Sequence, residues 1–256
     1  MNLIRTNSSL PAAVLWDMDG TIVDTEPYWM LAETELVASF GGTWTHEDCM
    51  QMVGNGLEKS AEILQGAGVD MEIDAIVTLL TNRVQEQLNS HGLPWRPGAL
   101  ELLTALSAAG VPMALVTMSL KRMAQQIADK ITEQLGESPF ATIVAGDMVT
   151  DPKPHPEAYL LAADILGVDP VHCIAIEDSV PGLAAAVSAG TIAIGVPHQI
   201  ALASADDYIL WASLAGRGLD DLAELYHDRI GSLDSNHSET ITSRPTAHEL
   251  EDVSRA

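Results

Sequence analysis

The sequence predicts an α/β protein in which helices cover a parallel β-sheet and an all-α domain is inserted after the first strand. Short apolar runs of strand length alternate with helical patterns along most of the chain, the order typical of α/β folds. None of these runs alternates cleanly between apolar and polar residues, so both faces of each strand are expected to be buried. Residues 27–95 contain helical patterns and no convincing strand, which indicates the insertion.

Five apolar runs are the expected strands, and the helical patterns between them end at glycines. One pattern of leucines closes at Gly110, and a helix over residues 157–166 follows Pro156 and closes at Gly167. Proline near a helix start and glycine after its end have the matching backbone preferences. Ser119 is a plausible helix N-cap after the second strand. The expected strands are residues 12–16, 112–116, 141–145, 172–176 and 191–196.

The inserted stretch has the features of a small helical bundle. Thr45 followed by Asp48 resembles a capping box at a helix start. The segment HGLPWRPG, residues 91–98, is rich in proline and glycine and is expected to form a hinge back into the sheet. Two apolar stripes at helical spacing support the helices, namely Tyr28, Ala32, Leu36 and Phe40, and then Ile73, Val77, Leu80, Val84 and Leu88.

These patterns divide the chain into a discontinuous core and a cap. The core is expected to comprise residues 1–26 and 96–230, and the cap residues 27–95. After residue 230 the composition becomes polar and loses its periodicity. Residues 231–256 are therefore predicted to form a disordered tail.

Composition excludes several classes of function. The chain has 256 residues, 47% of them hydrophobic, which is enough for a substantial core. Its formal net charge of -24, with only 12 Lys and Arg, argues against binding to nucleic acid or to an anionic membrane. Two distant cysteines, Cys49 and Cys173, make no disulfide framework. Neither a signal peptide nor a membrane span is indicated, so we expect a cytoplasmic protein, a monomer or weak dimer.

Polar residues follow several of the predicted strands. Asp17 follows the first strand, Thr117 the second, and Glu177 and Asp178 the fourth. Ligands of an open parallel sheet bind outside the carboxyl ends of its strands. These side chains, together with Asp19, are expected to line one acidic pocket.

Such a pocket needs positive charge. Two carboxylates ~4 Å apart repel each other by roughly 4 kcal/mol at an effective dielectric constant of about 20. A few oxygen ligands around a phosphate favour Mg²⁺ over Zn²⁺ as the compensating ion. Lys153, held between Pro152 and Pro154 in a stiff loop, is the second expected positive charge. Gly20 permits a tight turn after Asp19 and a close approach of backbone N–H groups to an anion.

Four segments, in this order, resemble the motifs of the haloacid dehalogenase-like hydrolase superfamily. They are DMDGTIVD at residues 17–24, Thr117 at the end of MALVT, Lys153 in DPKPHP, and IEDS at residues 176–179. The helical insertion is similar to the cap of the subgroup that includes beta-phosphoglucomutase and small sugar phosphatases. The resemblance implies a Rossmann-like core with a mobile helical cap. It also implies a phosphatase acting on a small phosphorylated metabolite, of the sugar or polyol monophosphate class.

The resemblance further implies roles for individual residues. Asp17 is the nucleophile that forms an aspartyl-phosphate, and Asp19 is the general acid and base. Thr117 and the backbone around Met118 hold the phosphoryl oxygens, and Lys153 steadies both the nucleophile and the phosphate. The implied magnesium site comprises Asp17, Asp19 through its carbonyl group, Asp178 and the adjacent Glu177.

Other functions fit the residues less well. A calcium loop would need its glycine at the sixth position and an acidic residue where Tyr28 stands. A non-catalytic receiver-like phospho-acceptor module has no counterpart of Asp19 and no large helical insertion. By the same resemblance, a phosphomutase would have a histidine in place of Trp29 and an arginine in place of Leu57. The phosphomutase and the receiver-like module remain the alternatives.

The loop VGNGLEKS, residues 53–60, is the candidate for substrate selection. Asn55, Glu58 and Lys59 are expected to hydrogen-bond a sugar or polyol when the cap closes and excludes water. The alternative is that the two glycines of the loop only end and begin helices, and the sequence does not decide between the two. Phosphonate hydrolysis through a Schiff base would need a buried Lys59.

Overall fold

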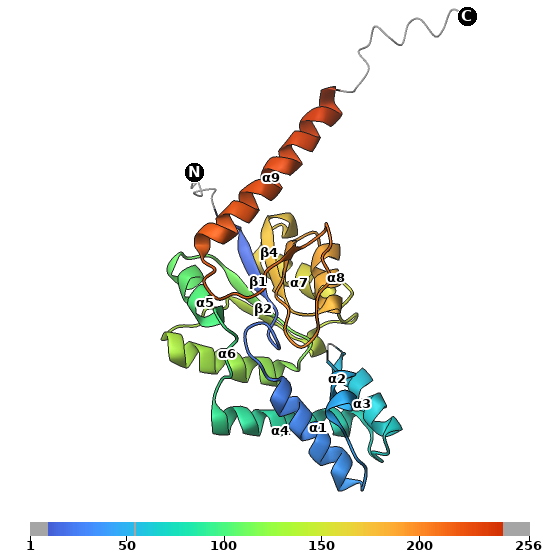
Figure 1. Ribbon diagram of the computed structural model, residues 1–256. Coiled ribbons are helices and arrows are strands. Elements are labelled where there is room, and N and C mark those ends of the chain that lie inside the picture. The colour runs from blue at the N-terminus through green and yellow to red at the C-terminus, as the bar shows by residue number, and fades with distance from the viewer. Residues whose placement is uncertain (1–9, 54, 243–256) are drawn as a thin grey trace, which may run out of the picture.

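The computed structural model describes residues 10–53 and 55–242, and for residues 232–242 the backbone only. Its core is a six-stranded sheet in the order β3-β2-β1-β4-β5-β6, in which each neighbouring pair of strands is parallel (Figure 1). This arrangement confirms the predicted α/β, Rossmann-like fold. The strands are β1 (Ala13–Trp16), β2 (Met113–Val116), β3 (Thr142–Val144), β4 (Cys173–Glu177), β5 (Ile192–Gly195) and β6 (Ile209–Leu210).

Both faces of the sheet are buried, which explains why its strands are apolar without alternation. In β1, Val14 and Trp16 belong to one apolar cluster, and Ala13 and Leu15 belong to a second cluster on the other face. Helices α7 (Glu157–Leu166) and α8 (Val180–Ser188) contribute to the second cluster, and α5 (Ala99–Ala108), α6 (Lys121–Leu135) and α9 (Leu219–Thr242) contribute to the first.

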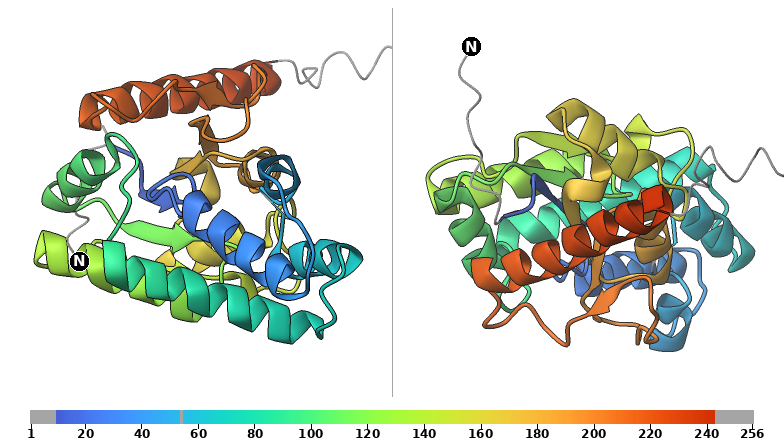
Figure 2. Two further views of the ribbon diagram at one scale, coloured as in Figure 1. Left: turned by 60° about the horizontal axis from the view of Figure 1, so that its bottom comes forward. Right: turned by 90° about the horizontal axis from the view of Figure 1, so that it is seen from above.

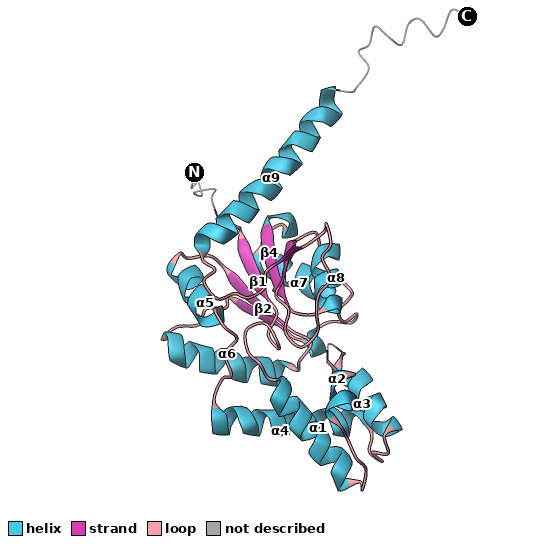
Figure 3. Cartoon of the chain, in the orientation of Figure 1, coloured by secondary structure: helices cyan, strands magenta, loops and turns pink. Residues whose placement is uncertain are grey.

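The inserted domain consists of helices, and Figure 3 shows the strands of the described chain gathered in the core. The predicted capping box is present, since Thr45 Oγ1 accepts the Asp48 N–H at 3.2 Å and Asp48 Oδ2 accepts the Thr45 N–H at 2.8 Å. Apolar residues of the cap join the cluster on one face of the sheet, so the cap packs against the core. The helices are α1 (Glu26–Ser39), α2 (His46–Met50), α3 (Leu57–Gly66) and α4 (Ile73–His91).

Two segments connect the cap with the core, and they lie side by side. The Asp24 N–H donates to the Pro94 carbonyl at 2.7 Å, and the Arg96 N–H donates to the Ile22 carbonyl at 2.9 Å. A hinge between the cap and the core would lie at these two adjacent connections. The domain boundaries after residue 26 and before residue 96 stay a prediction, which this pairing supports.

The sheet has one strand more than expected, and the first cap helix is shorter than its apolar stripe. β6 contains only two residues and pairs with β5 at the edge of the sheet, so it is too short to leave a pattern. Helix α1 ends at Ser39, and Phe40 at its C-cap is 43% exposed. The stripe therefore buries Ala32 and Leu36 but not its last member.

Helix α9 continues to Thr242, within the stretch predicted to be a disordered tail. It projects from the core on the side away from the cap (Figures 1 and 2). Tyr226 packs against the core, and no proline follows it before Pro245, so backbone hydrogen bonding extends the helix past its packed part. Residues 243–256 of the predicted tail lie outside the described residues. Within the described chain, no helix combines the length and apolarity needed to cross a membrane.

Candidate active site

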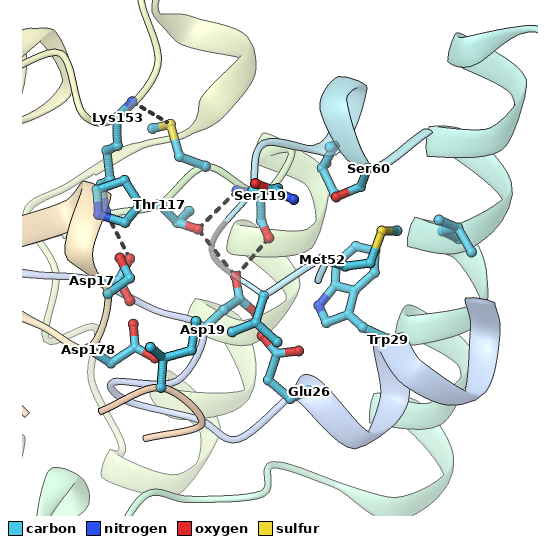
Figure 4. Close-up of a pocket in the computed structure, with 18 of the residues that line it drawn as sticks. Asp17, Asp19, Glu26, Trp29, Met52, Ser60, Thr117, Ser119, Lys153 and Asp178 are labelled. Carbon is cyan, nitrogen blue, oxygen red and sulfur yellow. Dashed lines mark hydrogen bonds and ion pairs between the residues drawn. The ribbon is translucent and has the colours of Figure 1, made fainter. Parts of the chain in front are cut away.

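The three central strands bring the predicted site residues together. β1 lies between β2 and β4. Asp17 directly follows β1, Thr117 directly follows β2, and Glu177 ends β4, and all three are buried. Because parallel strands share one carboxyl edge, these side chains meet there, and Figure 4 shows Asp17 and Thr117 in the pocket at this edge. The same pocket is lined by Asp19, Met118, Lys153 and Asp178.

Three oxygens hold the Lys153 ammonium group inside the pocket. Its Nζ lies 2.8 Å from Asp17 Oδ1, 2.6 Å from Glu177 Oε1 and 2.9 Å from the Val116 carbonyl oxygen. Burial alone would lower the pKa of Lys153, but the two carboxylates outweigh that effect and raise the pKa. The ammonium group is therefore charged at neutral pH and fixed in position.

Asp17 has one engaged oxygen and one unengaged oxygen. Oδ1 accepts the bond from Lys153, whereas Oδ2 is buried and has no hydrogen-bond partner among the described residues. Burial raises the pKa of Asp17 to about 7, the neighbouring Glu177 carboxylate adds to the rise, and Lys153 opposes it. One ammonium group thus compensates two carboxylates incompletely, and a second cation would favour the charged form of Asp17.

Glu177 is fully buried, and donors from the protein occupy its carboxylate. Oε1 accepts from Lys153 and from the Tyr159 hydroxyl, each at 2.6 Å, and Oε2 accepts from Ser179 Oγ at 3.2 Å. Gly182 makes room for this group, because a Cβ there would lie 2.0 Å from the carboxyl carbon. Glu177, predicted as part of the metal site, thus holds Lys153 in place. Tyr159 was not predicted, since no motif marks it.

Gly20 makes room for Asp178. Gly20 has a φ of +87°, and a Cβ at this position would lie 2.0 Å from Asp178 Oδ2. The tight turn expected after Asp19 therefore also admits a carboxylate. Burial, followed by the charges of Asp17 and Glu177, raises the pKa of Asp178 well above its ordinary value.

The donor set suits a hard divalent cation. Asp17, Glu177 and Asp178 each present an oxygen atom within 4.8 Å of the others. Both oxygens of Glu177 already accept hydrogen bonds, whereas Oδ2 of Asp17 is buried without a donor. Oxygen-only ligands are those that Mg²⁺ and Ca²⁺ take in proteins. The two aspartates are therefore the principal candidates for holding such an ion.

Hydroxyl groups hold the side chain of Asp19. Ser119 Oγ donates to its Oδ2 at 2.7 Å, Thr117 Oγ1 lies 3.3 Å from the same oxygen, and the Thr25 hydroxyl donates to Oδ1. The Thr117 hydroxyl also accepts the Ser119 N–H at 3.0 Å. The expected N-cap role of Ser119 is wrong, because Leu120 is the N-cap of α6 and the Ser119 hydroxyl is directed to Asp19.

Side chains from the cap form the opposite wall of the pocket (Figure 4). Trp29 of α1 and Ser60 of α3 are buried in this wall. Asn55, predicted to select the substrate, lines the pocket, and its side-chain amide donates to the Gln51 carbonyl at 2.8 Å. The wall also includes Glu26, Glu33, Met52, Val53, Leu57 and Leu80.

The structure does not place Glu58 and Lys59, also predicted to select the substrate, at this pocket. Both residues are exposed, and the Lys59 side chain, 64% exposed, pairs with Glu62 at 2.8 Å. Helix α3 buries the face that contains Ser60, Ala61 and Leu64, and Glu58 and Lys59 lie on its solvent-exposed side. The exposure of Lys59 also removes the support for a Schiff-base mechanism.

Two carboxyl groups of the cap wall have raised pKa values. Burial, assisted by neighbouring carboxylates, raises the pKa of Glu26 to about 8. Burial raises the pKa of Glu33 to about 7, and the nearby Trp44 indole and Cys49 thiol oppose the rise. Neither glutamate was predicted. A signal for Glu33 exists in the sequence, because it lies four residues after Trp29 on a helix face that is otherwise apolar.

Comparisons with known proteins agree with this geometry. A family model for haloacid dehalogenase-like hydrolases matches residues 11–190. The phosphorylated carbohydrates phosphatase of Thermotoga maritima is 33% identical over 73% of this chain and 86% of its own length. A mutant of CbbY from Rhodobacter sphaeroides, solved in complex with xylulose-(1,5)bisphosphate, is 30% identical with a TM-score of 0.72 over 83% of this chain and 99% of that chain. A putative beta-phosphoglucomutase from Thermotoga maritima, 25% identical, gives a TM-score of 0.63 over 84% of this chain and 98% of its own.

The matches and the geometry together define the class of this protein, a phosphoric monoester hydrolase. The chain belongs to the haloacid dehalogenase-like hydrolase family, as the order of its four sequence segments predicts. The predicted subgroup, with a helical cap inserted after the first segment, is confirmed by the similarity to CbbY and to the putative beta-phosphoglucomutase.

Proposed function

We propose that this chain is a Mg²⁺-dependent phosphatase that hydrolyses a sugar or polyol monophosphate through an aspartyl-phosphate on Asp17. The observation that carries the proposal is the state of Asp17, with one oxygen bonded to Lys153 and the other buried without a partner in the described chain. An oriented carboxylate with an unengaged oxygen is suited to nucleophilic attack. The relative that is a phosphorylated carbohydrates phosphatase supports the substrate class.

The reaction consists of two displacements at phosphorus. In the first, a carboxylate oxygen of Asp17 attacks phosphorus, the bond from phosphorus to the ester oxygen breaks, and Asp19 gives a proton to the leaving alcohol. In the second, Asp19 takes a proton from water, the water oxygen attacks phosphorus, and the bond from phosphorus to Asp17 breaks. The hydroxyls of Thr25 and Ser119 hold the Asp19 carboxyl group for both proton transfers.

The charged phosphoryl group needs donors and positive charge. Thr117, the backbone around Met118 and the Lys153 ammonium group would hold the phosphoryl oxygens. Asp17, Asp178 and the carbonyl group of Asp19 would hold Mg²⁺. When bound, Mg²⁺ supplies the charge that offsets the repulsion between a phosphate and the carboxylates around it.

The two alternatives have less support. A phosphomutase needs cations in the cap to retain the second phosphate of its intermediate, and the described cap residues that line the pocket carry none. Lys59 is exposed, and Arg83 pairs with Glu35 at 3.6 Å on the surface. A receiver-like module needs neither a cap nor Asp19. A cytoplasmic location and a monomeric or weakly dimeric state stay predictions.

Release of phosphate from p-nitrophenyl phosphate tests the proposal. The wild-type protein should turn over with Mg²⁺ and stop when EDTA removes the ion. Asp17→Asn should lower kcat by at least ~10³-fold and leave the chain unphosphorylated, and Asp19→Asn should lower it by about 10²-fold. Asp70→Asn, at an exposed position of the cap, is the matched control and should retain activity.

Three results would contradict the proposal. Stoichiometric phosphorylation of Asp17 without release of phosphate would favour the receiver-like module. Transfer of phosphate between two positions of a sugar, without net release, would favour the phosphomutase. Full activity of Asp17→Asn would exclude this nucleophile.

A further inference from the structure

Glu33 is a buried carboxyl group that the proposed reaction does not use. It lies on α1, is 5% exposed and lines the pocket from the cap side. Its Oε2 atom is buried, and no donor in the described chain reaches it with hydrogen-bond geometry. The Trp44 indole and the Cys49 thiol lie near enough to lower its pKa, but Trp44 Nε1 likewise lacks a partner of good geometry. Burying a carboxyl group without donors is costly, which points to a donor on the ligand.

The described residues place no cation against Glu33. Lys153 is the basic side chain among the described residues that line the pocket, and two core carboxylates already hold it. The cap's own basic residues, Lys59 and Arg83, lie on its surface, where each pairs with an exposed glutamate. When Glu33 is ionised, above its pKa of about 7, a negatively charged part of a ligand would therefore meet negative charge at the cap wall.

The rest of the cap wall indicates the kind of ligand that supplies the donors. Ser60 contributes a hydroxyl group, and Trp29 and Met52 contribute apolar surface in the same wall (Figure 4). Polar acceptors beside apolar surface suit a carbon chain or ring that carries hydroxyl groups. Hydroxyl hydrogens satisfy a carboxylate without requiring a charge on the ligand.

We propose that Glu33 is a specificity-determining residue that accepts hydrogen bonds from hydroxyl groups of the leaving group. It thereby restricts the enzyme to monophosphates whose leaving group is neutral and polyhydroxylated, and it disfavours bisphosphates. This inference rests on the proposed phosphatase function and adds the residue that selects the substrate.

The test compares three substrates, namely glucitol 6-phosphate, fructose 1,6-bisphosphate and p-nitrophenyl phosphate. The leaving group of p-nitrophenyl phosphate has no further hydroxyl groups that could donate to Glu33. Glu33→Met removes the acceptor, and Glu33→Gln removes the charge but keeps an acceptor oxygen. Glu35→Gln is the matched control, since Glu35 lies on the same helix with a side chain 50% exposed. The rate on p-nitrophenyl phosphate reports whether each variant is folded.

The expected loss in kcat/KM on glucitol 6-phosphate is about tenfold or more for Glu33→Met, the size of one hydrogen bond to a charged group. The loss in kcat/KM of the same variant on p-nitrophenyl phosphate should be several-fold smaller, because this leaving group has no hydroxyl group that could donate to Glu33. Glu33→Gln should raise the rate on the bisphosphate relative to glucitol 6-phosphate, because it removes the repulsion. Glu35→Gln should change none of the three ratios.

Two results would overturn the inference and leave the proposed function standing. The first is an unchanged ratio of glucitol 6-phosphate to p-nitrophenyl phosphate in Glu33→Met. The second, which needs no variant, is a wild-type preference for the bisphosphate over the monophosphate. If the wild type instead hydrolyses none of the three substrates with Mg²⁺ present, the proposed function fails and this inference fails with it.

Discussion

The two walls of the pocket treat buried carboxyl groups differently. In the core wall, Asp17 and Glu177 share the ammonium group of Lys153 at 2.8 and 2.6 Å, and hydroxyl groups hold Asp19. In the cap wall, Glu33 is as well buried as Asp17, yet no donor of the described chain bonds its Oε2 atom. The core wall thus supplies much of the positive charge and many of the hydrogen-bond donors that its buried carboxyl groups need, and the cap wall does not.

This difference matches the two ends of a phosphate ester. The phosphoryl end is the same in every substrate, so fixed groups in the core can be oriented for it before binding. The leaving group differs between substrates. A wall with a buried acceptor that has no donor favours leaving groups that donate a hydrogen bond over those that do not. Three substitutions test this contrast between the core wall and the cap wall.

The largest expected effect comes from removing the compensation of the core wall. Lys153→Met leaves Asp17 and Glu177 buried without their cation and should lower the free energy of unfolding at pH 8 by about 3–5 kcal/mol. Lys59→Met, at an exposed ion pair, should change it by less than about 0.5 kcal/mol. Urea unfolding measures both, and equal effects would show that Lys153 compensates no buried charge.

A smaller effect is expected where the core wall admits Asp178. Gly20 and Gly41 have similar positive φ values, but a Cβ at Gly20 would overlap Asp178, whereas one at Gly41 would meet nothing within 4 Å. Gly41→Ala should cost about 1 kcal/mol of stability from the backbone alone, and Gly20→Ala about 3 kcal/mol. Gly20→Ala should also raise the Mg²⁺ concentration needed for activity. Identical behaviour of the two variants would argue against the packing of Asp178 on Gly20.

The smallest effect is expected in the cap wall and depends on pH. The pKa of Glu33 is about 7 in the folded chain against 4.5 in the unfolded chain. Between these values the folded state binds more protons, so this group stabilises the fold fully below pH 4.5 and loses its contribution as the pH rises through 7. In Glu33→Gln the decrease in stability from pH 5 to pH 8 should be smaller by about 2 kcal/mol.

Urea unfolding of the metal-free protein at several pH values measures this effect. Glu35→Gln should follow the wild-type profile, because Glu35 is half exposed. Parallel profiles for Glu33→Gln and the wild type would mean that the Glu33 carboxyl group is already charged and satisfied in the folded chain.

Much of the fold was predictable because burial of a whole strand or of one helix face constrains several residues of the same segment together. Strands β1 and β4 are buried on both faces, so their residues are apolar up to Glu177, which ends β4. The cap helices bury one face each, and α4 shows it in the spacing of Ile76, Leu80, Val84 and Leu88. β6 is too short for any period, and α9 extends to Thr242 without the apolar pattern that reveals a packed helix.

The site was predictable only where a residue occupies a marked position at a strand end or in a motif. Asp17, Thr117 and Lys153 are of this kind. Tyr159 and Glu33 are not, because each lies inside a helix; the apolar face around Glu33 indicates that it is buried but not that it faces the pocket. Tyr159 bonds Glu177 from a helix of the core, and Glu33 lines the pocket from a helix of the cap, so both reach the site through tertiary packing.

The order of amino acids alone settles which side chains sit at the ends of the strands, since burial of a strand and the turn after it are local properties of the chain. Which carboxyl groups obtain a donor is settled only by tertiary packing. Lys153 meets Asp17 across 136 positions of sequence, and Glu33 meets no comparable partner in the described cap. Such pairings require side chains to approach within a few ångströms. The number of residues between two segments does not predict whether their side chains come that close.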